Sequence, residues 1–207
     1  MSCSSRLRSS DSRRSLRFWR SCRIALFIAL IFVCVGFPSA ANAQQAKPQE
    51  YQVKAVYLYN FSKFVTWPAN SIQGDTFTVC VLGPDPFGPF LDTTLANETI
   101  GNRPLVAKRI SDFHEISGCQ ILFISASEAA HVNEILSPIE KSSVLTVSDI
   151  PSFTNSGGMI GFELIDNRVR FDVNLAAAEK AGLTLSSQLL KVATDVKNAP
   201  GAGGMKP

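Results

Sequence analysis

Residues 121–147, ILFISASEAAHVNEILSPIEKSSVLTV, contain the pattern that decides the fold. The segment starts and finishes with short apolar runs, Ile121–Ser125 and Val144–Val147, that are typical of buried strands. Between them, Ser127–Pro138 has the spacing of an amphipathic helix with a serine cap. A strand, a helix and a second strand in this order predict a right-handed crossover between parallel strands.

The same alternation extends toward the N-terminus. Phe77–Leu82 is another apolar strand, and Leu105–Ile110 alternates like a partly exposed one. Between them we expect a helix over Pro86–Leu95 that is capped by Asp85, and after them a helical turn over residues 111–118. Gln49–Trp67 has helical spacing, with a core face that holds Val53, Val56, Tyr57, Asn60, Phe61 and Phe64.

The last third of the chain has a different pattern. Met159–Ile165 and Arg168–Val173 are strand-like runs, and the Asp166-Asn167 pair between them suits a two-residue hairpin turn. Helical stretches follow at Leu175–Ala181 and Ser186–Val196. The expected fold class is therefore α/β: a single domain with a central, mostly parallel sheet, a C-terminal antiparallel hairpin and helices on both faces.

The N-terminus has the three parts of a secretory signal. Seven arginines precede residue 24, Ile24–Phe37 is a continuous apolar run, and Ala41-Asn42-Ala43 fits a cleavage site. We therefore expect a signal peptide over residues 1–43, an exported domain over 44–198 and a flexible tail over 199–207. An uncleaved N-terminal anchor is the alternative interpretation.

Charge and cysteine content change once that segment is removed. Seven of the 20 basic and one of the 17 acidic side chains lie in residues 1–43, so the net charge falls from +3 to about −3. This balance gives no support for nucleic-acid binding. Only Cys80 and Cys119 remain, and in an oxidising compartment they could form one disulfide or stay as two buried thiols.

The residues offer little for catalysis. His114 and His131 are the only histidines, and neither lies beside a nucleophile, an H-E-x-x-H motif or a cluster of metal ligands. In the GPDPFG segment, residues 83–88, prolines replace the amide donors of a phosphate-binding loop. We expect no enzymatic activity, no metal and no cofactor.

Several motifs occur together in an informative order: Asn60-Phe61, Trp67-Pro68, SDIP at 148–151, GGMI at 157–160, VRF at 169–171 and Asn174. In this order the chain resembles the YfiR family of exported bacterial proteins from about Tyr51 to Ala193. The resemblance implies an α/β fold, a periplasmic location, no catalysis and frequent homodimers. The namesake represses a membrane-anchored diguanylate cyclase by binding its periplasmic sensor domain.

The resemblance also bears on the cysteines and on the function. Cys80 and Cys119 match the positions of a family disulfide, whereas the second family cysteine pair has no counterpart in Pro151–Gly161. The implied role is control of cyclic-di-GMP signalling by contact with a membrane-bound protein that has a periplasmic sensor domain. The alternative is a periplasmic small-molecule-binding module that feeds a kinase or a transporter.

Eight residues are candidates for binding a ligand or partner. The first helix has more aromatic residues than a narrow core stripe needs, so Tyr57 and Trp67 could meet a partner or a second copy. Lys63 is the charged candidate on this helix. The simpler expectation is that Lys54 and Lys63 are both solvated. The others are Asp149, Glu163, Arg168, Arg170 and Asn174.

These last residues have both simple and functional interpretations. Glu163, Arg168 and Arg170 could pair across strands, or Arg170 could hold a carboxylate in a shallow pocket. Asp149 could form an Asx turn, or contribute to a site at the end of its strand. Asn174 could cap the final helices.

Overall fold

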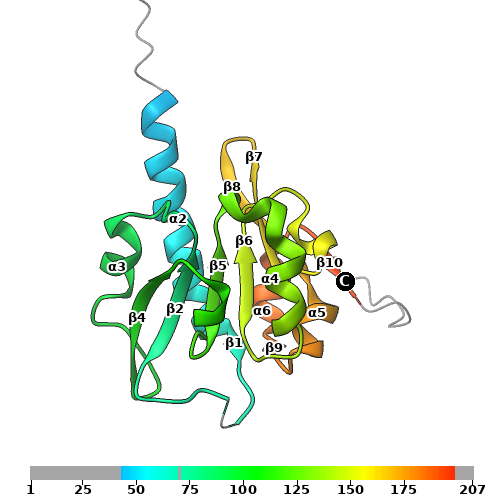
Figure 1. Ribbon diagram of the computed structural model, residues 1–207. Helices are drawn as coiled ribbons and strands as arrows, with labels where there is room; N and C mark the ends of the chain where they lie inside the picture. Colours follow the sequence, from blue (N-terminus) through cyan, green and yellow to red (C-terminus); the bar gives the residue numbers. More distant parts are fainter. Residues whose placement is uncertain (1–42, 70, 199–207) are drawn as a thin grey trace, which may run out of the picture. The chain divides into compact units, whose positions relative to one another are not determined.

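The computed structural model describes residues 43–198 with the exception of residue 70, and side chains from residue 49 onward (Figure 1). The predicted signal peptide and tail lie outside these residues, except that Ala43 begins the first helix. The elements are α2 (Ala43–Phe64), β1 (Val65–Thr66), β2 (Phe77–Leu82), α3 (Pro89–Leu95), β3 (Thr99–Ile100), β4 (Arg103–Ile110), η2 (Phe113–Ile116), β5 (Ile121–Ile124), η3 (Ala126–His131), α4 (Val132–Ile139), β6 (Leu145–Ser148), η4 (Phe153–Ser156), β7 (Ile160–Ile165), β8 (Arg168–Asn174), α5 (Leu175–Lys180), β9 (Thr184–Leu185), α6 (Ser187–Val192) and β10 (Val196–Lys197).

Eight strands form one mixed sheet in the order β10-β8-β7-β6-β5-β2-β4-β3, and β1 pairs with β9 in a separate two-stranded sheet. Strands β4, β2, β5, β6 and β7 are mutually parallel, and β7 and β8 form the antiparallel hairpin. The predicted fold class is confirmed. None of the helices within the described residues is long and apolar enough to cross a membrane.

Alternate residues of the central strands bury their side chains on the two faces of the sheet. Val79 and Val81 belong to a core that also contains buried residues of α2, α3, α5 and α6. Cys80 and Leu82 belong to a second core, formed with η2, α4 and η4. Because both faces are covered by helices, the central strands read as continuous apolar runs.

Helix α2 differs from the prediction in its length and in its buried face. It ends at Phe64, because Val65 and Thr66 pair with β9 instead of extending the helix. Val53 and Val56, assigned to the core, are 43% and 48% exposed, whereas Lys54, assigned to the solvent, is 3% exposed. The buried stripe contains Lys54, Ala55, Leu58, Phe61 and Ser62.

Other predicted helices are shorter than expected. Helix α3 begins at Pro89, not Pro86, because Asp85 accepts a hydrogen bond from Phe87 N and pairs with Arg109 instead of capping a helix. The helix expected over residues 127–138 is divided into η3, which buries no side chain, and α4, and no serine side chain caps either of them.

At the C-terminus, the helix predicted to reach Val196 ends at Val192. The chain then forms β10 beside β8, with Thr194 N donating to Phe171 O at 2.8 Å and Val173 N donating to Asp195 O at 2.9 Å. These bonds to a distant strand replace those of a further helical turn.

The hairpin has the predicted turn. Asp166 and Asn167 adopt φ values of 49° and 59°, the left-handed conformation that a two-residue turn of this type needs at both positions. The register runs from Ile160 opposite Val173 to Ile165 opposite Arg168, so Glu163 lies directly across from Arg170.

A disulfide joins Cys80, in β2, to Cys119, which lies two residues before the start of β5. Their thiol side chains are buried in the core on the α4 side of the sheet. The bridge closes a loop with a sequence separation of 39 residues. Of the two possibilities left open by the sequence, the structure contains the disulfide and not two free thiols.

Replacing both Cys80 and Cys119 with alanine is expected to lower the free energy of unfolding by about 3–4 kcal/mol, because the unfolded chain regains the entropy of an open loop. Urea unfolding followed by circular dichroism measures the loss. Wild-type protein unfolded with a reductant serves as the control and should reach a similar midpoint. An unchanged midpoint in both samples would contradict this account.

Candidate functional site

A groove lies between the first half of α2 and the β7–β8 hairpin. Its volume is about 410 Å³. Helix α2 contributes Gln49, Glu50, Val53 and Tyr57, and the hairpin contributes Leu164, Asn167, Arg168, Val169 and Arg170. We call this feature the α2–hairpin groove. It brings together three of the predicted site residues, since Tyr57 meets Arg168 and Arg170, which are more than 100 residues away from it in sequence.

Aromatic contacts hold the two walls of the groove in place. The ring of Tyr57 lies 5.9 Å from that of Phe162 and 5.5 Å from that of Phe171, measured between centroids. Phe61, one turn further along α2, stacks on the ring of Phe162 and meets the ring of Phe171 edge-on. Such contacts favour one relative position of helix and hairpin.

The apolar side chains beside the groove are unusually exposed. Leu164 is 53% exposed and Val53 is 43% exposed, and both line the groove from opposite walls. Val56 lies one turn from Val53 on α2 and is also exposed. Exposed apolar side chains that gather beside a concave surface are typical of binding sites.

The cations of the hairpin lack strong partners. Arg168 and Arg170 are exposed, and neither forms an ion pair within 4.0 Å with any described residue. Glu163 lies across from Arg170 in the register, but it neither pairs with it at that distance nor lines the groove. The arginines are therefore available to an acidic ligand.

A buried ion pair anchors the same half of α2. Lys54 Nζ lies 2.6 Å from Asp149 Oδ2 and 2.5 Å from Glu50 Oε1, and the Tyr51 hydroxyl donates to Asp149 Oδ2 at 2.8 Å. Burial, followed by the hydrogen bond to the Asp149 carboxylate, raises the pKa of Tyr51 well above its ordinary value. Asp149 Oδ1 is buried without a hydrogen-bond partner among the described residues. Asp149 does lie at the end of its strand as predicted, but Lys54 covers it.

The remaining predicted residues lie elsewhere. Lys63 is exposed, with its ammonium 4.1 Å from the centre of the Tyr59 ring. Trp67 directly follows β1 and packs edge-on against Phe77, with the two ring centroids 5.0 Å apart. Neither residue lines the α2–hairpin groove.

Asn174 also has a structural contact set. Its Oδ1 accepts a hydrogen bond from Ala177 N at 3.0 Å, which caps α5 as the sequence indicated. Its Nδ2 donates to the carbonyl of Thr154 at 3.0 Å, which joins the end of β8 to η4.

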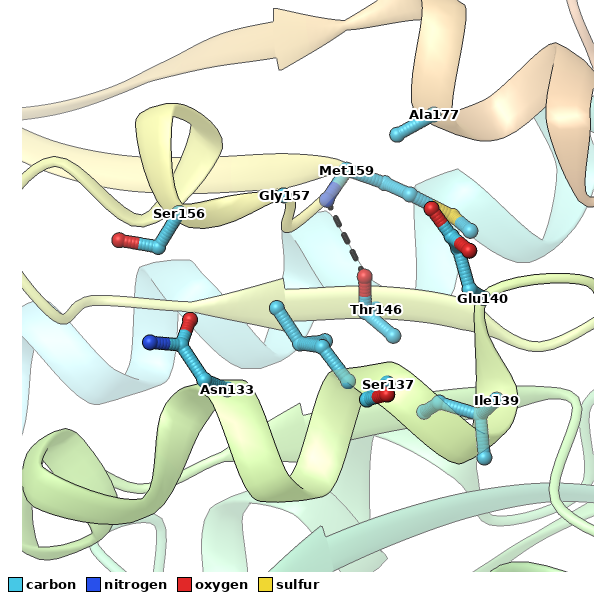
Figure 2. A pocket seen from close by; sticks show the side chains of 10 residues that line it. Asn133, Ser137, Ile139, Glu140, Thr146, Ser156, Gly157, Met159 and Ala177 are labelled. Carbon is cyan, nitrogen blue, oxygen red and sulfur yellow. Dashed lines mark hydrogen bonds between the residues drawn. The ribbon is translucent and has the colours of Figure 1, made fainter.

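A second cavity, of about 280 Å³, lies between α4, β6 and the start of α5 (Figure 2). Asn133, Ser137 and Glu140 come from α4 and its end, and Thr146 Oγ1 accepts from Met159 N at 3.1 Å in its wall. It contains none of the eight predicted residues. A third cavity, of about 460 Å³, is lined by Cys119 and Gln120 just before β5, and it shares Ile139 with the second cavity.

Of the nine residues that line the groove, six were not among the predicted candidates, and Lys54, which anchors the helical wall beside it, was missed as well. Lys54 was assigned to the solvent, because nothing near it in sequence except Glu50 indicates a buried partner. Leu164 was read as an ordinary strand residue, because its apolar type gives no signal that it lies exposed near the turn of the hairpin. No group of three or more histidine, cysteine, aspartate or glutamate side chains within the described part of the chain could hold a metal ion.

Comparison with known proteins gives one family match. A family model described as YfiR/HmsC-like matches residues 51–194. No curated protein matches. Among solved structures, a conserved domain protein from Vibrio cholerae O1 biovar El Tor strain N16961 is similar with a TM-score of 0.49 and 11% sequence identity; the alignment covers 69% of this chain and 60% of that one.

Replacing Lys54 with methionine is expected to lower the free energy of unfolding by about 3 kcal/mol, because Asp149 is left as a buried charge without its counter-ion. The matched control is Lys63→Met on the exposed face of the same helix, which should change stability by no more than about 0.5 kcal/mol. Urea unfolding measures both. The double variant Lys54→Met/Asp149→Leu should recover part of the loss, and equal losses at positions 54 and 63 would show that the ion pair contributes nothing.

Proposed function

The chain belongs to the YfiR/HmsC-like family, and from this we propose that it is an exported, non-catalytic regulator of a membrane-bound signalling enzyme. The partner is a membrane protein with a periplasmic sensor domain, and the enzyme whose activity this sensor domain controls is a diguanylate cyclase. The matched residues 51–194 include both walls of the α2–hairpin groove except Gln49 and Glu50. Export through the predicted signal peptide, cleavage near Ala43 and homodimer formation are parts of the same proposal.

One observation carries the proposal that this protein acts by contact. Val53, Val56 and Leu164 are exposed apolar side chains on the two elements that border the groove. Burying such side chains against a partner is favourable by about 25 cal/mol per Å² of apolar surface. The positive rim formed by Arg168 and Arg170 would add specificity for an acidic surface.

The mechanism is a population shift. The regulator binds one conformation of the sensor domain more tightly than the other, and so changes the fraction of receptor in the active state. The change is transmitted across the membrane by the receptor, so the regulator itself needs no reactive group. Its affinity difference between the two conformations sets the size of the response.

The test is to delete the gene, measure cellular cyclic-di-GMP, and restore the gene as wild type, Leu164→Asp or Val192→Asp. We expect the deletion to raise cyclic-di-GMP, wild type and Val192→Asp to lower it again, and Leu164→Asp to fail because it places a charge on the contact surface. Val192, on α6, is 61% exposed and is therefore a matched control. Unchanged cyclic-di-GMP on deletion would remove the cyclase from the proposal.

The second candidate function is a sensor for a small molecule. The size of the α2–hairpin groove, about 410 Å³, lies within the usual range for ligand sites, and its two arginines suit a carboxylate. Thermal unfolding in the presence of amino acids, vitamins and nucleobases tests it, since a ligand of the folded state raises the melting temperature in a saturable way. Arg170→Ala should remove that rise if Arg170 holds the carboxylate, and no rise with any compound would count against this function.

A further inference from the structure

The outer part of β8 has an unpaired backbone edge. Asn174 N donates to Met159 O at 2.8 Å, which identifies these two residues as a hydrogen-bonded pair of the antiparallel ladder. Hydrogen-bonded and non-hydrogen-bonded pairs alternate along such a ladder. In the observed register, Arg168 and Arg170 therefore direct their peptide groups toward β7, and Val169 directs its N–H and C=O away from it.

Contacts at the other end of β8 agree with this assignment. Val173 N donates to Asp195 O, and Phe171 O accepts from Thr194 N, so both residues use their outward groups to bind the segment that leads into β10. Strand β10 pairs with β8 only at Val173 and Asn174. No described backbone group pairs with the outward N–H and C=O of Val169.

The hairpin extends beyond its neighbours. Figure 1 shows β7 and β8 projecting past the tip of β6, and β6 pairs with β7 only at Ile160 and Gly161. Natural sheets commonly protect such edges with charge, proline or a covering element. Here the exposed Leu164 lies opposite Val169 at the projecting end.

The unpaired edge forms a wall of the α2–hairpin groove. Residues 167–170 line it on one side, and Val53 and Tyr57 line it on the other. Arg168 and Arg170 are adjacent to this edge on one face of the strand, and Val169 is on the other face. A strand added here would place alternate side chains beside the two arginines on one face and toward Val53 and Tyr57 in the groove on the other.

Strand β10, the last element of the described residues, does not approach that edge. Strand β10 runs parallel to β8, so the chain passes Val173 and then Asn174 and moves away from the turn. Glu50 is the acidic residue among those that line the groove, and it is already paired with Lys54. Charge complementarity therefore favours an acidic segment from another protein.

We propose that the free edge of β8 at residues 168–170 binds an extended segment of the membrane-bound partner as an added strand. Acidic side chains of this segment lie beside Arg168 and Arg170, and an apolar side chain between them enters the groove. Main-chain hydrogen bonds to Val169 supply affinity, and the alternation of acidic and apolar side chains supplies specificity. The inference rests on the proposed function and names the surface through which it is carried out.

The test compares variants in the deletion strain, with cyclic-di-GMP as the readout. Val169→Pro removes the outward N–H at a position where proline breaks no ladder hydrogen bond, and Val169→Ala keeps that N–H while also shortening the side chain. Arg168→Glu/Arg170→Glu reverses the charge beside the edge, and Lys141→Glu makes a matched change at an exposed lysine on the loop after α4. Circular dichroism and thermal unfolding establish which purified variants fold.

We expect Val169→Ala and Lys141→Glu to restore wild-type regulation, and Val169→Pro and the double reversal to fail. Full regulation by Val169→Pro would overturn strand addition, even if the double reversal fails. If wild type itself leaves cyclic-di-GMP unchanged, the proposed function fails instead. A purified dimer that the double reversal converts to a monomer would also overturn the inference, since a second copy would then occupy the edge.

A second measurement does not depend on the folding of Val169→Pro or on the cyclase. Hydrogen exchange of the wild-type Val169 amide is measured alone and with membrane vesicles from the deletion strain. Protection by an added strand should slow exchange about tenfold or more, and the double reversal should abolish the effect. Equal exchange rates with and without vesicles would overturn the inference.

Discussion

The position of α2 depends on the buried pairing of Lys54 with Asp149. Both side chains are largely removed from water, and each charge is compensated there mainly by the other, with Glu50 as a further partner of Lys54 and Tyr51 as a further partner of Asp149. The apolar contacts of the same helix are made by a narrow stripe around Ala55, Leu58 and Phe61, and the rings of Tyr57 and Phe61 position it against the hairpin. The charge pair adds a separate constraint, since it fixes a point on α2 against the carboxyl end of β6. The wall of the groove that contains Val53 and Tyr57 is set by the same constraint.

The strands were largely predictable from the sequence, and the helical face was not. Apolar, β-branched runs such as Phe77–Leu82 predict central strands well, because strands that are covered on both faces need no alternation. The buried side of α2 was wrong because hydrophobicity patterns assign a lysine to the solvent. All four two-residue strands were missed: the pairing partners of β1, β9 and β10 are distant in sequence, and β3, although it pairs with the adjacent β4, is too short to show a strand pattern.

The candidate site was also predictable only in part, because residue type and strand alternation mark single positions but not which of them share a surface. Arg168 and Arg170 stood out as charged positions on an alternating strand, and the structure brings them to Tyr57. Trp67 and Lys63 also stood out by residue type, but they lie near the other end of α2. Which of these side chains share a surface depends on how helix and hairpin pack, and no local pattern contains that information. Residues 44–207 carry a net charge of about −3, so the exposed Arg168 and Arg170 form a local positive rim on an otherwise slightly acidic segment.

The two-residue repeat of the β7–β8 ladder limits how this region can change during evolution. Removing one residue from β8 would exchange the faces on which Val169 and Arg170 lie, and a guanidinium group would then take the buried position of Val169 in the core. Natural insertions and deletions in the hairpin should therefore occur in pairs, or be confined to the turn. Length variation among relatives should follow this even-numbered rule more strictly here than in the segment between β1 and β2, whose described residues form no strand pairing that would constrain the count.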